Sequence, residues 1–183
     1  MTGDAARPGD ALVGIPSSGL HSNGYTLARR ALLDDGGLAL GDRPPELGGA
    51  SVADALLEPT VIYVRAVLAL LRSGIGVRGL AHITGGGVRN LLRLGPGRIG
   101  FAIEAPLPAP PVFALVARLG SVPDAEMWEV FNMGCGFVAI VPDDRADEAA
   151  AVLAARHPGA ARIGAVTAEA GRVTVAGVAF AAA

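Results

Sequence analysis

Residues 11–33 read ALVGIPSSGLHSNGYTLARRALL. The apolar run Ala11–Ile15 predicts a strand, and the stretch from Tyr25 to Leu33 predicts a helix. A polar, glycine-bearing turn lies between them. The first amides of a helix have no intrahelical partners, and the helix dipole favours negative charge at that end. A strand, a glycine-bearing turn and a helix in this order therefore predict a place where an anion can bind.

This turn carries more polar side chains than a helix cap needs. One interpretation is a capped turn in which His21 is simply a satisfied, partly buried histidine. The other is a cradle for an oxyanion or a phosphate, with the His21 imidazole near its natural titration range. The residue types alone leave both open. The candidate binding residues of the cradle are Ser17, Ser18, Gly19, Ser22, Asn23 and Gly24.

A second strand, turn and helix unit follows in residues 80–94. Leu80–Thr84 predicts a short buried strand, and Val88–Leu94 predicts a helix. Three glycines between them allow a backbone to approach a ligand closely, although most such triplets are only turns. A P-loop is excluded because the G-K-[ST] ending is absent. Both turns carry a histidine and could line one mouth of a sheet. The candidates here are His82, Thr84, Gly85, Gly86 and Gly87.

The remaining polar positions favour structural interpretations. The segment Phe131–Gly136 is expected to be a turn in which Asn132 is a local cap and Cys135 a small buried residue. His157, beside Pro158-Gly159, is expected on the solvated surface. Three histidines and one cysteine lie far apart without ligand spacing, so we expect no metal site in this chain.

The rest of the chain predicts an α+β fold, one mixed sheet of five or six strands with helices on its faces. Residues 1–9 are expected to be a flexible lead, 10–178 a single domain and 179–183 a frayed tail. Two strands, Arg162–Thr167 and Arg172–Val178, are expected to pair as a hairpin around Gly171. The expected intervening elements are helices after the caps Ser51 and Thr60 (the latter Val61–Arg72), a strand Arg98–Glu104, helices Val112–Leu119 and Pro123–Val130, a strand Phe137–Val141 and a helix from Asp143 to about Arg156.

Composition narrows the class of protein. The 183 residues are 51% hydrophobic, which is typical of a globular chain, and a net charge of −2 gives no basic footprint for nucleic acid. No apolar run is long enough to span a membrane. One cysteine cannot form an internal disulfide, in agreement with a reducing cytoplasm. The chain has no lysine, so it cannot by itself complete a mechanism that needs a catalytic lysine.

Several strings together resemble a known family. They are Gly9-Asp10, GIPSSGLHSNGY at 14–25, LEPTVIYV at 57–64, AHITGGG at 81–87, and Glu126-Met127 with FNMG at 131–134. In this order they resemble the C-terminal domain of phosphoribosylformylglycinamidine cyclo-ligase, also called aminoimidazole ribonucleotide synthetase. The resemblance runs from about Pro8 to Val175.

The resemblance implies a function in purine biosynthesis. Enzymes of this family use ATP to convert formylglycinamidine ribonucleotide to aminoimidazole ribonucleotide. An N-terminal α/β domain supplies much of the ATP and Mg²⁺ site and most of the homodimer interface, and the C-terminal domain closes a cleft over it. The expected partners are therefore that domain and a ribonucleotide. This chain alone is expected to bind neither ATP nor Mg²⁺ and to be inactive.

The resemblance also implies roles for the two loops. The Ser17–Asn23 and Thr84–Gly87 loops would face the cleft and bind phosphate-bearing ligands. His21 would handle a proton during cyclisation, with Asn132 and Gly134 as secondary binding residues. Where the family has a longer segment after the glycines, this chain has only Val88-Arg89 before Asn90. The alternatives are a stand-alone, non-catalytic phosphate-ligand-binding module, or a divergent relative of the amidotransferases, selenophosphate synthetases or thiamine-phosphate kinases.

Overall fold

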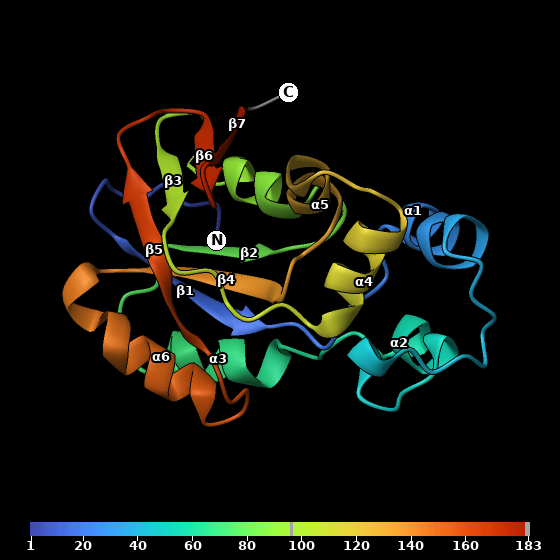
Figure 1. Cartoon of the computed structure of the whole chain (residues 1–183). Coiled ribbons are helices and arrows are strands. Elements are labelled where there is room, and N and C mark those ends of the chain that lie inside the picture. The colour runs from blue at the N-terminus through green and yellow to red at the C-terminus, as the bar shows by residue number, and fades with distance from the viewer. Residues whose placement is uncertain (96, 182–183) are drawn as a thin grey trace.

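A computed structural model describes residues 1–95 and 97–181. One seven-stranded sheet, in the order β2-β4-β1-β5-β3-β6-β7, forms its centre (Figure 1). The pairing of β3 with β6 is parallel, and the other neighbours are antiparallel. The predicted single mixed sheet of an α+β fold is confirmed. The strands are β1 Ala11–Pro16, β2 Gly79–His82, β3 Gly100–Ile103, β4 Cys135–Val141, β5 Ala161–Thr167, β6 Arg172–Val175 and β7 Val178–Ala181.

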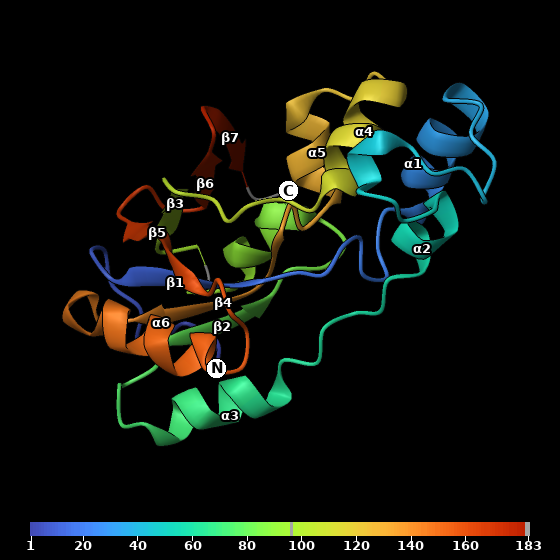
Figure 2. The same cartoon turned by 60° about the horizontal axis from the view of Figure 1, so that its bottom comes forward.

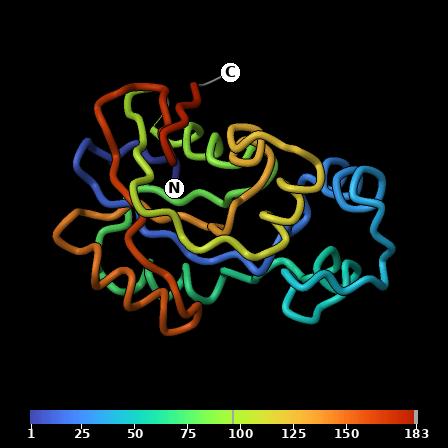
Figure 3. Tube along the Cα trace, viewed as in Figure 1, coloured from blue at the N-terminus to red at the C-terminus, as the bar shows by residue number. Residues whose placement is uncertain are grey.

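Helices cover the sheet and build a separate lobe beside it (Figures 1 and 3). Short 3-10 turns also occur at Pro45–Leu47 and Asp143–Arg145. The larger helical elements are α1 Tyr25–Arg29, its π-helical continuation η1 Arg30–Asp35, α2 Val52–Leu57, α3 Val64–Arg72, the 3-10 helix η3 Gly87–Arg93, α4 Pro111–Leu119, α5 Asp124–Val130 and α6 Ala146–Ala154.

Strand β1 explains why the sheet has helices on one face and a second core on the other. Its residues 11–15 are all buried, as expected for a central strand that is apolar throughout. Successive side chains of a strand point to opposite faces. Accordingly, Val13 and Ile15 pack with α3 and α6, while Leu12 packs on the other face with β3, β5 and η3.

The helical lobe has its own core. Helices α1, α2, α4 and α5 meet around Leu32, Phe113, Leu115 and Phe131, which are all buried, at the right of Figure 1. Ser51 caps α2 through the predicted capping box, in which Ser51 and Asp54 exchange side-chain and backbone hydrogen bonds. The first polar turn, between β1 and α1, thus connects the sheet to this lobe.

Several predictions about the chain's ends and turns are wrong. Strands β5 and β6 do not form a hairpin, because β3 lies between them and β6 instead pairs with β7. The predicted strand Arg172–Val178 breaks at Ala176-Gly177, where both residues have positive φ. The tail expected to fray forms β7 as far as Ala181, and residues 182–183 lie outside the described part.

Two helix predictions also need correction. Helix α3 begins at Val64 rather than directly after Thr60, whose hydroxyl lies 3.3 Å from Ser22 Oγ instead of capping the helix. The segment after the three glycines is a 3-10 helix rather than an α-helix. The N-terminal residues 1–9 make defined contacts: Thr2 forms a bridge with Gly79, and Gly9 donates a backbone hydrogen bond to Val166.

Candidate functional site

The three glycine-bearing turns meet at one edge of the sheet. Strands β1 and β2 both pair antiparallel with β4, so they run parallel to each other and end where β4 begins. Pro16 pairs with Cys135, and His82 pairs with Phe137. Asn23 Oδ1 lies 3.1 Å from the position that a Cβ atom on Gly85 would occupy. The structure therefore brings together the first loop (17–24), the second loop (84–87) and the third turn (131–136).

Asn132 joins the third turn to the first loop. Its amide nitrogen donates to the Gly19 carbonyl at 2.8 Å, and its Oδ1 accepts from Ser17 Oγ at 2.7 Å. The same oxygen accepts from the backbone N–H of Gly134 at 3.0 Å. Asn132 is 3% exposed, so in this conformation it acts within the protein scaffold. The local cap predicted from sequence is thus also a long-range connection.

His21 is buried at the centre of the first loop, with φ at +57° and only 3% of its surface exposed. Its Nε2 accepts the N–H of Ser18 at 3.3 Å, and Nδ1 has no partner among the described residues. Burial, and then the nearby charge of His82, lower the pKa of His21 from 6.5 to about 4. The imidazole is therefore neutral near pH 7, and the bond to Nε2 assigns its proton to Nδ1.

The loop's hydroxyl groups contact the segment between α2 and α3. Ser18 Oγ donates to the Pro59 carbonyl at 2.7 Å, and Ser22 Oγ lies 3.3 Å from Thr60 Oγ1. This explains why residues 58–60 break the helical pattern: their backbone and side chains hold the first loop. The sequence analysis used Pro59 and Thr60 as a helix boundary and as part of a family string, but did not predict that they contact the first loop.

Asn90 holds the second loop. Its Oδ1 accepts from both the N–H and the hydroxyl of Thr84 at 2.9 Å, and its Nδ2 donates to the Gly85 carbonyl at 3.1 Å. Asn90 is buried. It was not among the predicted site residues, and its bonds reach five and six residues back, beyond the i−3 and i−4 positions that such side chains commonly bond.

The unusual Arg89 points away from the loops. Its guanidinium pairs with Glu129 of α5 at 3.1 Å and lies 5.9 Å from the centre of the Phe180 ring in β7. Arg89 therefore connects η3 to α5 and to the C-terminal hairpin. The short segment after the glycines does not place a charge among the loops.

Two loop glycines are required by close packing. A Cβ atom on Gly87, where φ is +49°, would lie 2.0 Å from the Trp128 carbonyl oxygen. A Cβ atom on Gly24, where φ is +72°, would lie 2.2 Å from the Phe131 ring. Both contacts reach α5 or its C-terminal end, so α5 sets the position of the two loops.

All three histidines of the chain surround Tyr63. The Tyr63 ring centre lies 6.1 Å from His21, 5.8 Å from His82 and 5.4 Å from His157. Its hydroxyl donates to the Pro16 carbonyl at 3.0 Å, and burial raises its pKa. His157 is half-buried against this ring, so the prediction that it lies on the solvated surface is wrong. Tyr63 itself was absent from the predicted site.

Burial divides the predicted site residues into two groups. Gly19, His21, Gly87, Asn132 and Gly134 are buried and build the scaffold. Within the described ranges, no backbone acceptor is found for the N–H groups of Asn23, Gly24, Gly85 and Gly86. The residues that reach the surface are Ser17, Ser18, Ser22, Asn23, Gly24, His82, Thr84, Gly85 and Gly86.

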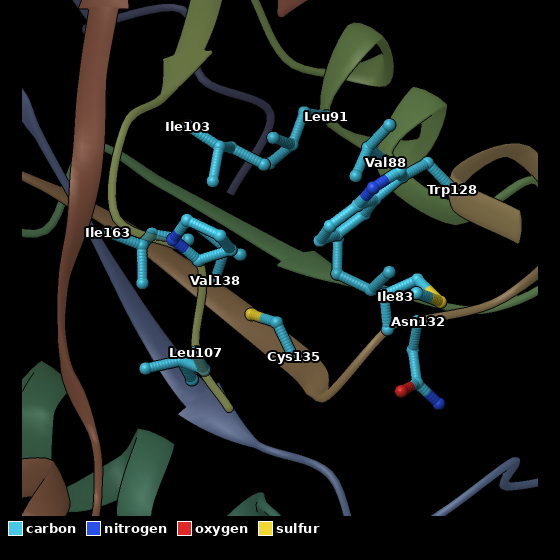
Figure 4. Close-up of a pocket in the computed structure, with 12 residues that line it drawn as sticks. Ile83, Val88, Leu91, Ile103, Leu107, Trp128, Asn132, Cys135, Val138 and Ile163 are labelled. Atoms are coloured by element: carbon cyan, nitrogen blue, oxygen red, sulfur yellow. The ribbon is translucent and has the colours of Figure 1, made fainter. Parts of the chain in front are cut away.

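An apolar pocket lies behind the loops, between β4, η3 and α5 (Figure 4). Val88, Leu91, Trp128 and Val138 help to line it, and the Asn132 amide points away from its centre. Burial raises the pKa of the Cys135 thiol to about 12, so this sulfur stays protonated. Because most of the side chains that line this pocket are apolar, the pocket suits an apolar group rather than a charged ligand.

The structure also bears on metals and membranes. Among residues 1–95 and 97–181, no cluster of three or more His, Cys, Asp or Glu side chains has an arrangement that could hold a metal ion. No helix in the same part of the chain is long and apolar enough to cross a bilayer.

Solved structures share this fold. The crystal structure of hydrogenase maturation protein HypE matches 98% of this chain with a TM-score of 0.59 and 26% identity, and the match covers 54% of the HypE chain. The protein tt0281 from Thermus thermophilus matches 97% of this chain with a TM-score of 0.58 and 23% identity, over 52% of its own length. The class is therefore a domain of the HypE-like α+β fold, and the chain corresponds to about half the length of these two solved chains.

Sequence comparison identifies the family. The family model "AIR synthase related protein, C-terminal domain" matches residues 7–176, and the chain belongs to this family. The phosphoribosylformylglycinamidine cyclo-ligase of Myxococcus xanthus is 51% identical over 95% of the chain, and that of Thermococcus gammatolerans is 52% identical over 84%. The chain spans 50% and 43% of these two relatives, respectively. The predicted resemblance is confirmed.

Proposed function

We propose that this chain is the C-terminal, cleft-closing half of an ATP-dependent cyclo-ligase that forms aminoimidazole ribonucleotide from formylglycinamidine ribonucleotide. The observation that carries the proposal is the meeting of the first and second loops at one sheet edge, in a chain similar to cyclo-ligases over most of its length. The exposed hydroxyl of Ser22 and the loop N–H groups that have no backbone acceptor among the described residues suit a phosphate.

Within this proposal the surface residues bind the ligand, and the buried ones hold them. Ser22 and Asn23 would contact phosphate oxygens, together with the N–H groups of Gly85 and Gly86. Thr84, whose hydroxyl donates to Asn90, would hold the second loop in place. Asn132 and Gly134 would act by positioning the first loop. An N-terminal half would supply much of the ATP site and most of the homodimer interface. The complete enzyme would be a homodimer in the cytoplasm.

His21 is the proposed proton-handling residue. Its neutral imidazole carries a proton on Nδ1 that no described residue accepts, so it can donate to an oxygen that develops negative charge. Nδ1 is buried, and this role therefore requires the first loop to move when the ligand enters.

ATP and Mg²⁺ belong, in this proposal, mainly to the other half of the enzyme. The chain offers phosphate-binding loops but, within its described residues, no carboxylate cluster suited to Mg²⁺. Mg²⁺, when bound, would neutralise phosphate charge during transfer. The part of this chain would be to orient the phosphate-bearing ligand and exclude water from it.

A chimera tests the proposal. The N-terminal half of the Myxococcus xanthus relative would be joined to this chain, and ATP-dependent formation of aminoimidazole ribonucleotide measured, with the intact relative as the positive control. We expect turnover by the chimera, none by the chain alone, and a fall in kcat of about 100-fold or more in His21→Asn. A folded chimera that binds ATP and forms no product would contradict the proposal.

A further inference from the structure

Helix α3 is apolar on two opposite faces. Its inner face, with Ala66 and Leu70, packs on the sheet. Its outer face carries Val64, Leu68 and Leu71, at the i, i+4 and i+7 spacing of one helical stripe. We call these three residues and the preceding Ile62 the α3 patch. Their side chains are 41–79% exposed, Ile62 the most.

The α3 patch is unusual for this molecule. It contributes four of the seven large hydrophobic residues that are exposed in the described chain. Arg65 and Arg72 are the charged residues of α3 and are exposed, whereas the apolar face of a helix is normally covered. Figure 2 shows α3 at the lower edge of the molecule, with α6 and the sheet on one side and no other described element on its outer side.

The patch continues into the candidate site. A groove beside it is lined by Ile62, Val64 and Leu68 from α3 and its approach, and by Tyr63, His82 and Phe137 at the sheet edge. His82 lies two residues before Thr84 of the second loop, and the Tyr63 ring lies beside His21. Whatever covers the α3 patch would therefore also reach the edge of the ligand site.

We propose that the α3 patch and this groove are the docking surface for the N-terminal half that the relatives carry and this chain does not contain. This inference rests on the proposed function. The relatives are about twice as long as the chain, and the site proposed here needs a second half at this sheet edge. The occupant would present a complementary apolar surface, with polar groups near His82.

Binding between separately produced halves tests the proposal. The chain would be titrated with the N-terminal half of the Myxococcus xanthus relative by calorimetry. We expect Leu68→Glu to weaken the affinity at least tenfold, since it places a charge in the covered stripe. Leu40→Glu, at an exposed leucine outside the patch, is the matched control and should bind like the wild type. Equal affinity of wild type and Leu68→Glu would overturn the proposal.

A second measurement tests the proposal even if the N-terminal half does not fold when it is produced alone. Hydrogen exchange of residues 62–72 would be compared in the isolated chain and in the chimera, and we expect slower exchange in the chimera. Unchanged exchange would overturn the proposal. A dimer of the isolated chain that Leu68→Glu dissociates, while exchange in the chimera stays unchanged, would assign the patch to a second copy instead.

The outcomes also separate this inference from the proposed function. Tight binding that Leu68→Glu weakens, in a chimera without turnover, supports the docking surface and contradicts the cyclo-ligase activity. Turnover that Leu68→Glu leaves unchanged, with unchanged exchange at α3, supports the activity and overturns the docking surface.

Discussion

The first and second loops lie side by side, yet they are held in different ways. The first depends on distant residues: Asn132 reaches Ser17 and Gly19, and Pro59 accepts from Ser18. The second is held mainly by Asn90, six residues or fewer away. The position of the first loop therefore depends on the whole fold. The second loop keeps its conformation through hydrogen bonds to a nearby residue, and the close packing of Gly87 on α5 fixes its position.

The largest loss of stability should come from substituting Gly87, because this residue of the second loop packs tightly against α5. Gly87→Ala combines a positive φ with a Cβ contact of 2.0 Å to the Trp128 carbonyl. We expect a loss of about 3 kcal/mol in the free energy of unfolding. Gly37→Ala, with φ at +64° and no atom within 4 Å, isolates the backbone term and should cost about 1 kcal/mol. Urea unfolding of the two variants measures both losses. Equal losses would show that the contact of Gly87 with α5 adds nothing to the cost of the backbone conformation.

Removing the two asparagines compares the loops directly. Asn132→Ala leaves the buried carbonyl of Gly19 and the buried N–H of Gly134 unpaired, and we expect a loss of about 2–3 kcal/mol. Asn90→Ala frees groups of Thr84 and Gly85 that water can reach, so about 1–2 kcal/mol is expected. Chemical denaturation gives both values. A larger loss in Asn90→Ala would reverse the comparison.

The pH dependence of stability tests the burial of His21 in the first loop. Its pKa is about 4 in the folded state against an ordinary 6.5, so the unfolded chain binds more protons between these values. The free energy of unfolding should therefore fall as pH decreases from 6.5 to about 4. His21→Asn keeps a residue that tolerates positive φ and should flatten this slope. An unchanged slope would mean that His21 is accessible to protons in the native state.

The smallest effect is expected from the outer hydroxyl of the first loop. Ser18→Ala removes the bond to the Pro59 carbonyl, near the surface, where water can replace it. We expect a loss of about 0.5 kcal/mol, measured by thermal unfolding. A loss as large as that of Asn132→Ala would indicate that the α2–α3 connection, rather than the third turn, holds the loop.

Local chemistry allowed much of this fold to be predicted. The apolar run at β1, the capping box at Ser51 and the glycines of the second loop each specify a conformation from nearby residues. The meeting of the two histidine-bearing turns was also foreseen, because both follow strands. Pairing between distant strands was not: the insertion of β3 between β5 and β6 depends on contacts that leave no local signal.

The same limit explains the errors within the site. The apolar spacing of Val64, Val67, Leu68 and Leu71 indicated a helix but not which side faces the core, because α3 has two apolar faces. Tyr63 and His157 lie far apart in sequence, so their contact required the fold. Asn90 was missed because its bonds reach five and six residues back, beyond the local patterns that are common for asparagine.

The central claim is that the two loops form one half of a ligand site that another domain completes. Hydrogen exchange of residues 17–24 and 84–87, with and without formylglycinamidine ribonucleotide, tests it most directly in the chimera and in the isolated chain. We predict that the ribonucleotide slows exchange at both loops in the chimera, and much less in the isolated chain. Ligand-dependent protection confined to the N-terminal half of a ribonucleotide-bound chimera would contradict the account.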